Sequence, residues 1–101
     1  MYFGTVARLH LKPNMLDRFF AYGEEQQRRT DISGGVAMIV FQSDTDPLEI
    51  YLVVVAESEE QYRAQAASPE QHQEYLRMRE MLQADPEWHD GQVLFAEFPP
   101  T

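Results

Sequence analysis

The chain has 101 residues, enough for one domain over residues 1–101 with a single hydrophobic core. Its 17 acidic and 8 basic residues give a formal charge of -9, which disfavours nucleic acids and anionic membrane surfaces as partners because both would be repelled. It contains no cysteine, no signal-peptide pattern and no run of about 20 apolar residues that could span a bilayer. We therefore expect a soluble, cytoplasmic protein without disulfide bonds or thiolate chemistry.

The first predicted element is a strand over residues 2–12. An apolar face alternates with a mixed face along it. The apolar face would consist of Phe3, Thr5, Ala7, Leu9 and Leu11. Arg8 and His10 fall on the mixed face, so they would point either into a cavity or into an interface. Asn14 follows the strand and is a candidate cap for the next helix.

The second predicted element is an amphipathic helix over residues 15–29. Its apolar side would carry Met15, Leu16, Phe19, Phe20, Tyr22 and Gly23. Glycine inside a helix costs about 1 kcal/mol relative to alanine. Gly23 would therefore serve a purpose there, either a close approach of the helix to a sheet or room for a ligand.

Two apolar segments, residues 36–41 and 48–56, are joined by the turn at 43–47 and predict a β-hairpin. Apolar residues occupy both faces of this hairpin, whereas an antiparallel sheet usually keeps one face in water. The remaining chain supplies helices for one face only. We therefore expect a second copy of the chain to cover the other face.

A helix broken in two is predicted next, over residues 59–67 and 69–83. Ser58 and Ser68 each stand where a serine caps a helix N-terminus, and Pro69 suits the first helical position. The second helical segment therefore begins with a serine cap that is followed by a proline.

Residues 84–91 are expected to form a loop, in which Trp88 either buries itself as a structural plug or contacts a ligand. A last strand over residues 92–98 would complete the fold. The predicted order is strand, helix, strand, strand, helix, strand. This is the order of an α+β ferredoxin-like sandwich with an antiparallel sheet.

Two stretches carry a resemblance to a known family. They are Val-Val-Ala-Glu-Ser-Glu-Glu-Gln-Tyr at 54–62 and Ala-Ser-Pro-Glu-Gln-His-Gln-Glu-Tyr at 67–75. Together with the element order over the whole chain, they resemble the antibiotic biosynthesis monooxygenase-like family of the dimeric α+β barrel superfamily. The resemblance implies a homodimer whose sheets face each other and a cavity in each subunit between sheet and helices.

The resemblance is weaker toward the haem-degrading members of this family. These carry an asparagine, a tryptophan and a histidine ligand at positions that correspond here to Ala7, Ala56 and Tyr75. His72, one turn before Tyr75, is the alternative iron ligand. The spacing of the three histidines matches no metal-ligand motif. We expect no metal and no bound cofactor.

Oxygenation without a cofactor needs a pocket that binds an electron-rich phenol or quinol and stabilises its anion. The candidate catalytic residues are His72, Tyr75 and Tyr22. The candidate substrate-binding residues are Arg8, His10, Phe19, Gly23 and Trp88. Alternatively, the tyrosines pack as core rings and the fold is a non-catalytic ligand-binding or stress-response module. Under the first interpretation the ligand is a small hydrophobic or aromatic molecule.

Overall fold

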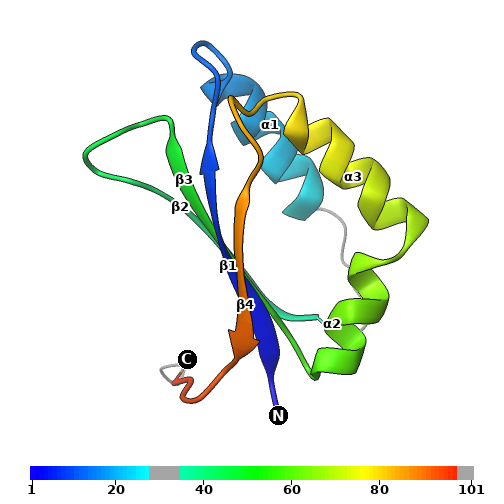
Figure 1. Cartoon of the computed structure of the whole chain (residues 1–101). Coiled ribbons are helices and arrows are strands. Elements are labelled where there is room, and N and C mark those ends of the chain that lie inside the picture. Colours follow the sequence, from blue (N-terminus) through cyan, green and yellow to red (C-terminus); the bar gives the residue numbers. More distant parts are fainter. Residues whose placement is uncertain (28–34, 98–101) are drawn as a thin grey trace.

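A computed structural model of the chain describes residues 1–27 and 35–97 and shows a four-stranded sheet with helices on one face (Figure 1). The elements are β1 (Phe3–His10), α1 (Leu16–Gln27), β2 (Gly35–Gln42), β3 (Glu49–Ala56), α2 (Glu59–Ala66), α3 (Pro69–Arg79) and β4 (Glu87–Gln92). The strand order is β2-β3-β1-β4 and every neighbouring pair is antiparallel. The predicted α+β sandwich is therefore confirmed.

Strand β1 lies inside the sheet and has the predicted alternation. Phe3, Thr5, Ala7 and Leu9 are buried on the helix side, while Val6 is 45% exposed on the outer side. The strand is shorter than predicted at both ends, although Leu11 still forms an isolated bridge with Leu82. Because β1 pairs with both β3 and β4, its alternation determines which residues of the sheet face the helices.

The core is concentrated at one end of the sheet, where α1 and the end of α3 pack on it. Its largest fully buried side chains are Leu9, Leu11, Ile50, Met81 and Leu82. Backbone hydrogen bonds close this end, with Lys12 N–H donating to the Met81 carbonyl at 2.8 Å. At the other end α2 buries no residue of its own.

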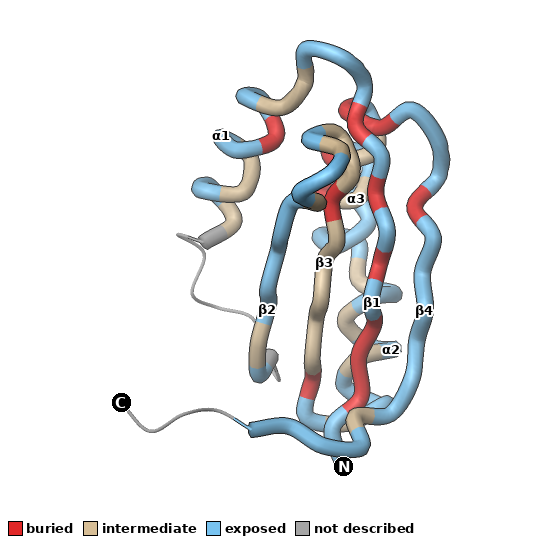
Figure 2. Tube along the Cα trace, turned by 90° about the vertical axis from the view of Figure 1, so that its left-hand side faces the viewer, coloured by how far each residue is buried: buried red, intermediate tan, exposed pale blue. Residues whose placement is uncertain are grey.

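The hairpin of β2 and β3 lies within one residue of the predicted boundaries, and β2 is exposed on both faces (Figure 2). Ile39 and Phe41, on the outer face, are 51% and 50% exposed. Met38 and Val40, on the helix side, are 42% and 45% exposed. A single copy of the chain therefore leaves apolar side chains of this strand in water.

Both predicted serine caps are confirmed. Ser58 Oγ accepts a hydrogen bond from the N–H of Gln61, and Ser68 Oγ accepts one from the N–H of Gln71, each at 3.1 Å. Helix α3 ends at Arg79, earlier than predicted, and the predicted end of α1 at 28–29 lies outside the described residues.

Two predictions around α1 are wrong. Asn14 does not cap the helix, because α1 begins at Leu16 and Asn14 adopts a left-handed backbone with φ 68° in the preceding turn. Asparagine tolerates this conformation better than most residues. Phe20, which was expected on the buried side, is 52% exposed.

The predicted last strand at 92–98 is also wrong. Strand β4 occupies Glu87–Gln92, which was expected to be loop, and residues 93–97 have no regular structure. All residues of β4 are exposed, so an edge strand of polar residues can form here without the apolar alternation that reveals buried strands. Trp88 consequently lies on a strand and is 44% exposed, which excludes its role as a buried plug.

Among the residues that the structure describes, no helix has the length and apolar character needed to cross a membrane.

Candidate functional site

The three candidate catalytic residues lie on two helices. His72 and Tyr75 are on α3, with ring centroids 6.5 Å apart and ring planes at 22°. Tyr75 is half-buried and packs against the core, whereas His72 is exposed. Tyr22 reaches from α1, and its hydroxyl donates to the Glu74 backbone carbonyl at 3.3 Å. Tyr22 therefore already has a partner and helps to join α1 to α3.

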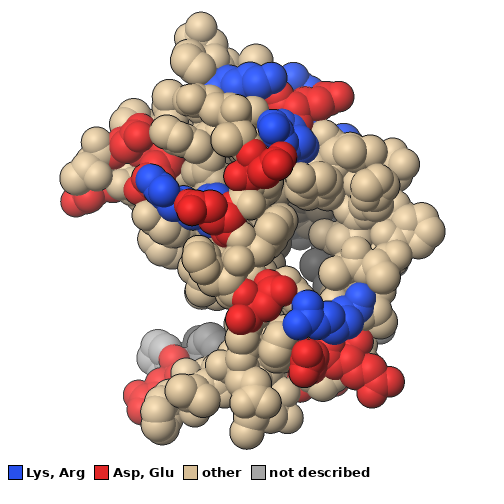
Figure 3. Space-filling view, viewed as in Figure 1, with Lys and Arg blue, Asp and Glu red and all other residues tan. Residues whose placement is uncertain are grey.

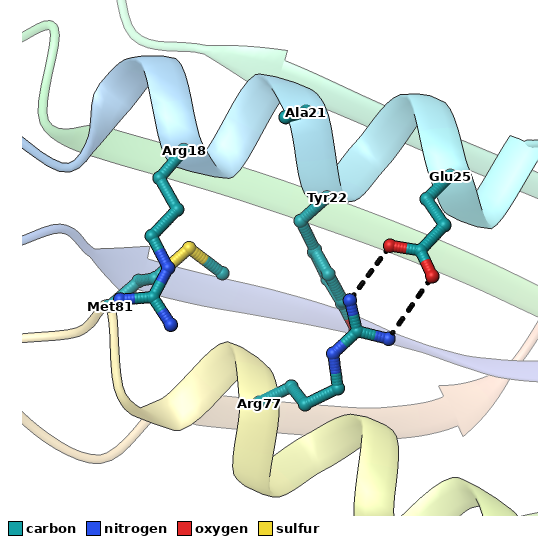
Figure 4. A pocket seen from close by; sticks show the side chains of 6 residues that line it. All are labelled: Arg18, Ala21, Tyr22, Glu25, Arg77 and Met81. Atoms are coloured by element: carbon teal, nitrogen blue, oxygen red, sulfur yellow. Dashed lines mark hydrogen bonds and ion pairs between the residues drawn. The ribbon is translucent and has the colours of Figure 1, made fainter.

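A pocket of about 180 Å³ lies between α1 and α3 (Figure 4). Its lining consists of Arg18, Ala21, Tyr22, Glu25, Arg77 and Met81. Small-molecule sites typically measure about 300–1,000 Å³, so this pocket is small for a ligand. Neither His72 nor Tyr75 lines it.

An ion pair crosses this pocket. Arg77 Nη2 lies 2.7 Å from Glu25 Oε2, and the Arg77 guanidinium stands over the Tyr22 ring at 5.4 Å (Figure 4). The hydrogen bond with Glu25 raises the pKa of Arg77. Glu74, 9% exposed, accepts a 2.6 Å hydrogen bond from Gln26 Nε2. These contacts hold the two helices together, and a ligand would have to break them to enter.

Figure 3 shows a hollow between the sheet and the helices, next to the β4 edge. It is distinct from a second pocket of about 210 Å³ on the outer face of the sheet, where Val6, Val53 and His89 contribute to the lining. Trp88 and Asp90 face the helix side of β4, because they pair with Ala7 and Thr5 of β1. Part of the Trp88 ring is therefore available for contact with a ligand. At Gly23 on α1, no atom of the described part lies within 4 Å of where a Cβ would be, which favours the prediction of free room over that of close helix packing. Phe19 is 7% exposed and belongs to the core.

A polar cluster between α2 and β4 was not predicted. The Tyr62 hydroxyl donates to Asp90 Oδ1 at 2.9 Å, and Arg63 Nη1 lies 3.3 Å from Asp90 Oδ2. The buried Thr5 Oγ1 completes no hydrogen bond among the described residues. We call Thr5, Tyr62, Arg63 and Asp90 the Asp90 cluster. It joins α2 to two strands of the sheet.

The environment of the Asp90 cluster shifts two pKa values in opposite directions. Burial, followed by the hydrogen bond to Asp90, raises the pKa of Tyr62. Burial is also the largest influence on Asp90 and raises its pKa, but the neighbouring Thr5 hydroxyl, the hydrogen bond from Tyr62 and the charge of Arg63 together outweigh it and lower the pKa. Asp90 is thus a carboxylate that accepts hydrogen bonds at neutral pH and holds protons poorly.

No local pattern revealed the Asp90 cluster. Asp90-Gly91 has the composition of a turn, and Tyr62 stands in a strongly polar helix. Only the pairing of Asp90 with Thr5 across β1 and β4 brings these groups together. The one usable signal was Thr5, a polar residue on an otherwise apolar strand face.

Arg8 and His10 lie on the outer face of the sheet, away from the helices. Arg8 donates to Glu49 Oε2 from Nη2 at 2.6 Å and to Glu87 Oε2 from Nη1 at 3.1 Å. His10 Nε2 lies 3.2 Å from Asp46 Oδ2. The hydrogen bond from Arg8 lowers the pKa of Glu49. Of the two alternatives for His10, the structure therefore places it on the side expected to face a second subunit, and Arg8 lies with it.

No protein-family model matches this sequence, and no curated protein matches it at a significant level. Solved structures do match. A "putative antibiotic biosynthesis monooxygenase" from Chloroflexus aurantiacus is 21% identical, with a TM-score of 0.78 over 97% of this chain and 98% of that one. A similarly described protein from Bordetella bronchiseptica is 17% identical, with a TM-score of 0.78 over 93% and 98%. The chain shares the fold of these structures.

A protein of unknown function from Nitrosomonas europaea has the same fold, with a TM-score of 0.80, 15% identity and coverage of 99% of this chain and 96% of that one. Within the fold of the present chain, the candidate residues divide between two regions. Trp88, Tyr75 and His72 belong to the sheet edge and the helical layer, whereas Arg8 and His10 lie on the opposite face. A single ligand in the hollow therefore cannot contact all of them.

Proposed function

We propose that two copies of this chain form a homodimer through the outer faces of their sheets. Each subunit would bind a hydrophobic, aromatic molecule between its sheet and helices and oxidise it with molecular oxygen, without a bound cofactor. The likeness of nearly the whole chain to structures described as antibiotic biosynthesis monooxygenases carries this proposal. Three features of the chain support the separate parts of the proposal.

The first feature is an apolar patch on the outer face of the sheet. Val6, Ile39 and Phe41 are each about half exposed there, next to the half-buried Val53 and Val55. Contiguous apolar patches of this kind on soluble proteins typically mark interaction sites. An identical face on a second copy would be a self-complementary cover, as a two-fold interface requires.

The second feature is the half-exposed ring of Trp88, which faces the helix side of β4. Its flat face offers an aromatic ligand a stacking surface. Asp90 stands two residues along the same face of β4, about 7 Å away at the rise of a strand. A hydroxyl of a ligand stacked on Trp88 would therefore reach the Asp90 carboxylate as an acceptor.

The third feature is the pair of rings on α3. Histidine and tyrosine are the polar groups that a phenol or quinol needs near its reacting carbon, since both can exchange a proton or hydrogen bond with an anion. His72 and Tyr75 lie together on the helix that borders the hollow. When molecular oxygen oxidises a methylene group to a carbonyl, one oxygen atom enters the product. The second oxygen atom leaves as water with the two methylene hydrogens.

Oxygen consumption tests the catalytic part of the proposal. Purified protein is incubated with a panel of hydroquinones and anthrones in an oxygen electrode. We expect uptake above that of buffer for at least one compound, with on the order of a tenfold loss of rate in His72→Ala or Tyr75→Phe. Leu76→Ala, at an exposed neighbour on α3, is the matched control and should keep the rate. Uptake equal to buffer for the whole panel would refute oxygenation.

The small pocket volume between α1 and α3 favours a second candidate, a binding module without catalysis. The chain has one tryptophan, so its fluorescence reports on Trp88 alone. Under this alternative, the same compounds would quench Trp88 fluorescence saturably while oxygen uptake stays at the level of buffer. Quenching and uptake that show the same half-saturating concentration would instead favour the enzyme.

A further inference from the structure

Thr5 carries a buried hydroxyl without a hydrogen-bond partner. The residue is 4% exposed on the helix side of β1, and no group in the described part of the chain completes a hydrogen bond with its Oγ1. Phe3 and Ala7, its neighbours on the same face of the strand, are buried and apolar. An unpaired buried hydroxyl is unfavourable, because it has lost its contact with water and gained no partner. Valine has a similar shape and would avoid this cost, so the Thr5 hydroxyl is a candidate for a role in binding.

The groups beside Thr5 show what kind of group fits there. Asp90 is paired with Thr5 across β1 and β4, and its side chain is 31% exposed. Asp90 Oδ1 accepts a 2.9 Å hydrogen bond from the Tyr62 hydroxyl, which also neighbours the Thr5 hydroxyl. This place therefore already binds the hydroxyl of a phenol, but the phenol belongs to α2 and not to a ligand.

Helix α2, which carries Tyr62, is held lightly. It has no fully buried residue, and the Tyr62 ring packs on Phe3 with ring centroids 5.3 Å apart. Asp90 alone can accept a ligand hydroxyl beside Tyr62, but Thr5 can join only when the Tyr62 hydroxyl moves aside. Its departure would leave a free acceptor on Asp90 next to the unpaired hydroxyl of Thr5, and such a pair complements one hydroxyl group.

We propose that Thr5 and Asp90 form a subsite for a neutral hydroxyl group of an aromatic ligand, and that the Tyr62 hydroxyl occupies this subsite until the ligand displaces it. This rests on the aromatic ligand of the proposed function. The ligand hydroxyl would donate to Asp90 and accept from Thr5. Its ring would lie toward Trp88, two residues from Asp90 on the same face of β4. The subsite selects the ligand and takes no part in its oxidation.

Charge determines which aromatic ligands suit the subsite. The Asp90 carboxylate attracts a hydroxyl donor and repels an anion. Arg63 does not offset this repulsion freely, because its guanidinium already lies 3.3 Å from Asp90 and 3.4 Å from Glu59. A methyl ether has no proton to donate. The subsite should therefore favour a phenol over both its methyl ether and the corresponding carboxylate.

Equilibrium dialysis at pH 7 under nitrogen tests this preference without depending on oxidation. The probes are 2-naphthol, 2-methoxynaphthalene and 2-naphthoate. We expect 2-naphthol to bind the unmodified chain at least about tenfold more tightly than the other two, because a site built to bind a hydroxyl rejects analogues that lack it.

Two variants assign the preference to the subsite. Thr5→Val and Asp90→Asn keep the shape of the side chain and should each weaken 2-naphthol binding about threefold to tenfold. Thr45→Val, at an exposed threonine in the hairpin turn, is the matched control and should bind like the unmodified chain. The urea midpoint of Thr5→Val should not fall, because the lost hydroxyl has no partner in the fold.

Tyr62→Phe distinguishes displacement from direct contact. Removing the competing hydroxyl should tighten 2-naphthol binding by about threefold or more, because the subsite is then free before the ligand arrives. Tyr2→Phe, at an exposed tyrosine, should leave the affinity unchanged. Weaker binding by Tyr62→Phe would mean that the Tyr62 hydroxyl itself contacts the ligand, and would overturn the displacement.

The remaining outcomes separate the subsite from the proposed function. Binding of 2-naphthol no tighter than that of the other two compounds overturns the subsite and leaves an aromatic pocket. A preference that Thr5→Val and Asp90→Asn both retain in full also overturns it, as does a lower urea midpoint for Thr5→Val, which would show a structural role of the hydroxyl. If none of the three compounds binds, the subsite and the proposed binding of aromatic molecules are both overturned.

Discussion

Asp90 illustrates how one side chain can serve both the fold and the candidate site. Its two carboxylate oxygens accept from Tyr62 and from Arg63, which fixes α2 on the sheet. Each oxygen keeps a further lone pair, so the same carboxylate can still accept a ligand hydroxyl. The lowered pKa fits this role as an acceptor and argues against Asp90 as a base.

Tyr62→Phe should weaken the fold in a pH-dependent way. Losing the hydrogen bond to Asp90 should cost about 0.5–1 kcal/mol at neutral pH, at the low end because the pair is partly exposed. Since the pKa of folded Asp90 lies below its ordinary 3.8, its contribution is complete above that value and is lost as the pH falls below it. The variant should therefore show a smaller loss of stability in acid.

Urea unfolding from about pH 2.5 to 7 measures this difference. Tyr2→Phe, at an exposed tyrosine of the same chain, is the control and should follow the unmodified protein throughout. Parallel curves for Tyr62→Phe and the unmodified chain would contradict the assignment of the acid dependence to this hydrogen bond.

At the scale of the elements, the fold depends on β1, which pairs on both sides. At Gly4, β1 approaches β3 so closely that a Cβ built there would collide with the Val54 backbone carbonyl. Gly91 pairs with Gly4 from the other side, yet a Cβ on Gly91 would meet nothing within 4 Å. Gly4 and Gly91 are thus paired across the two strands, but only Gly91 has room for a side chain.

Gly4→Ala should destabilise the protein by about 1–3 kcal/mol, because backbone atoms of β1 and β3 must move apart. Gly91→Ala should change the free energy of unfolding by no more than about 0.5 kcal/mol. Chemical denaturation of the two variants, side by side, makes the comparison. Equal effects would show that the tight contact at Val54 does not limit the spacing of β1 and β3.

Sequence patterns predicted the elements whose partners are apolar. Periodicity located α1, β2 and β3, and serine spacing located the break between α2 and α3. Strand β4 was missed because its residues other than Trp88 are polar or glycine and its pairing with β1 is a long-range property. In the candidate site, too, local patterns were predicted and long-range pairings were missed. His72 and Tyr75 were found together on one helix, whereas the joining of Asp90 to Tyr62 depends on sheet register, which no local pattern encodes.

For the whole molecule, the predicted homodimer can be tested on the outer face. Ile39→Lys would place a charge in the dry centre of the proposed interface, where an unpaired buried cation is strongly unfavourable. We expect a shift from dimer to monomer in analytical ultracentrifugation. Leu76→Lys, at a comparably exposed leucine on α3, should leave the dimer intact. Monomer formation by both variants would locate the contact elsewhere.

The uneven packing of the sandwich has a consequence for its motions. Leu9, Leu11 and Leu82 seal one end, while α2 at the other end has no fully buried residue and contacts the sheet through the Asp90 cluster and the packing of Tyr62 and Arg63 on Phe3. Amide protons of α2 should therefore exchange with solvent through local opening at a lower free energy than those in the middle of β1. Such breathing would give an aromatic molecule an intermittent entrance beneath α2, with the sealed end serving as the hinge.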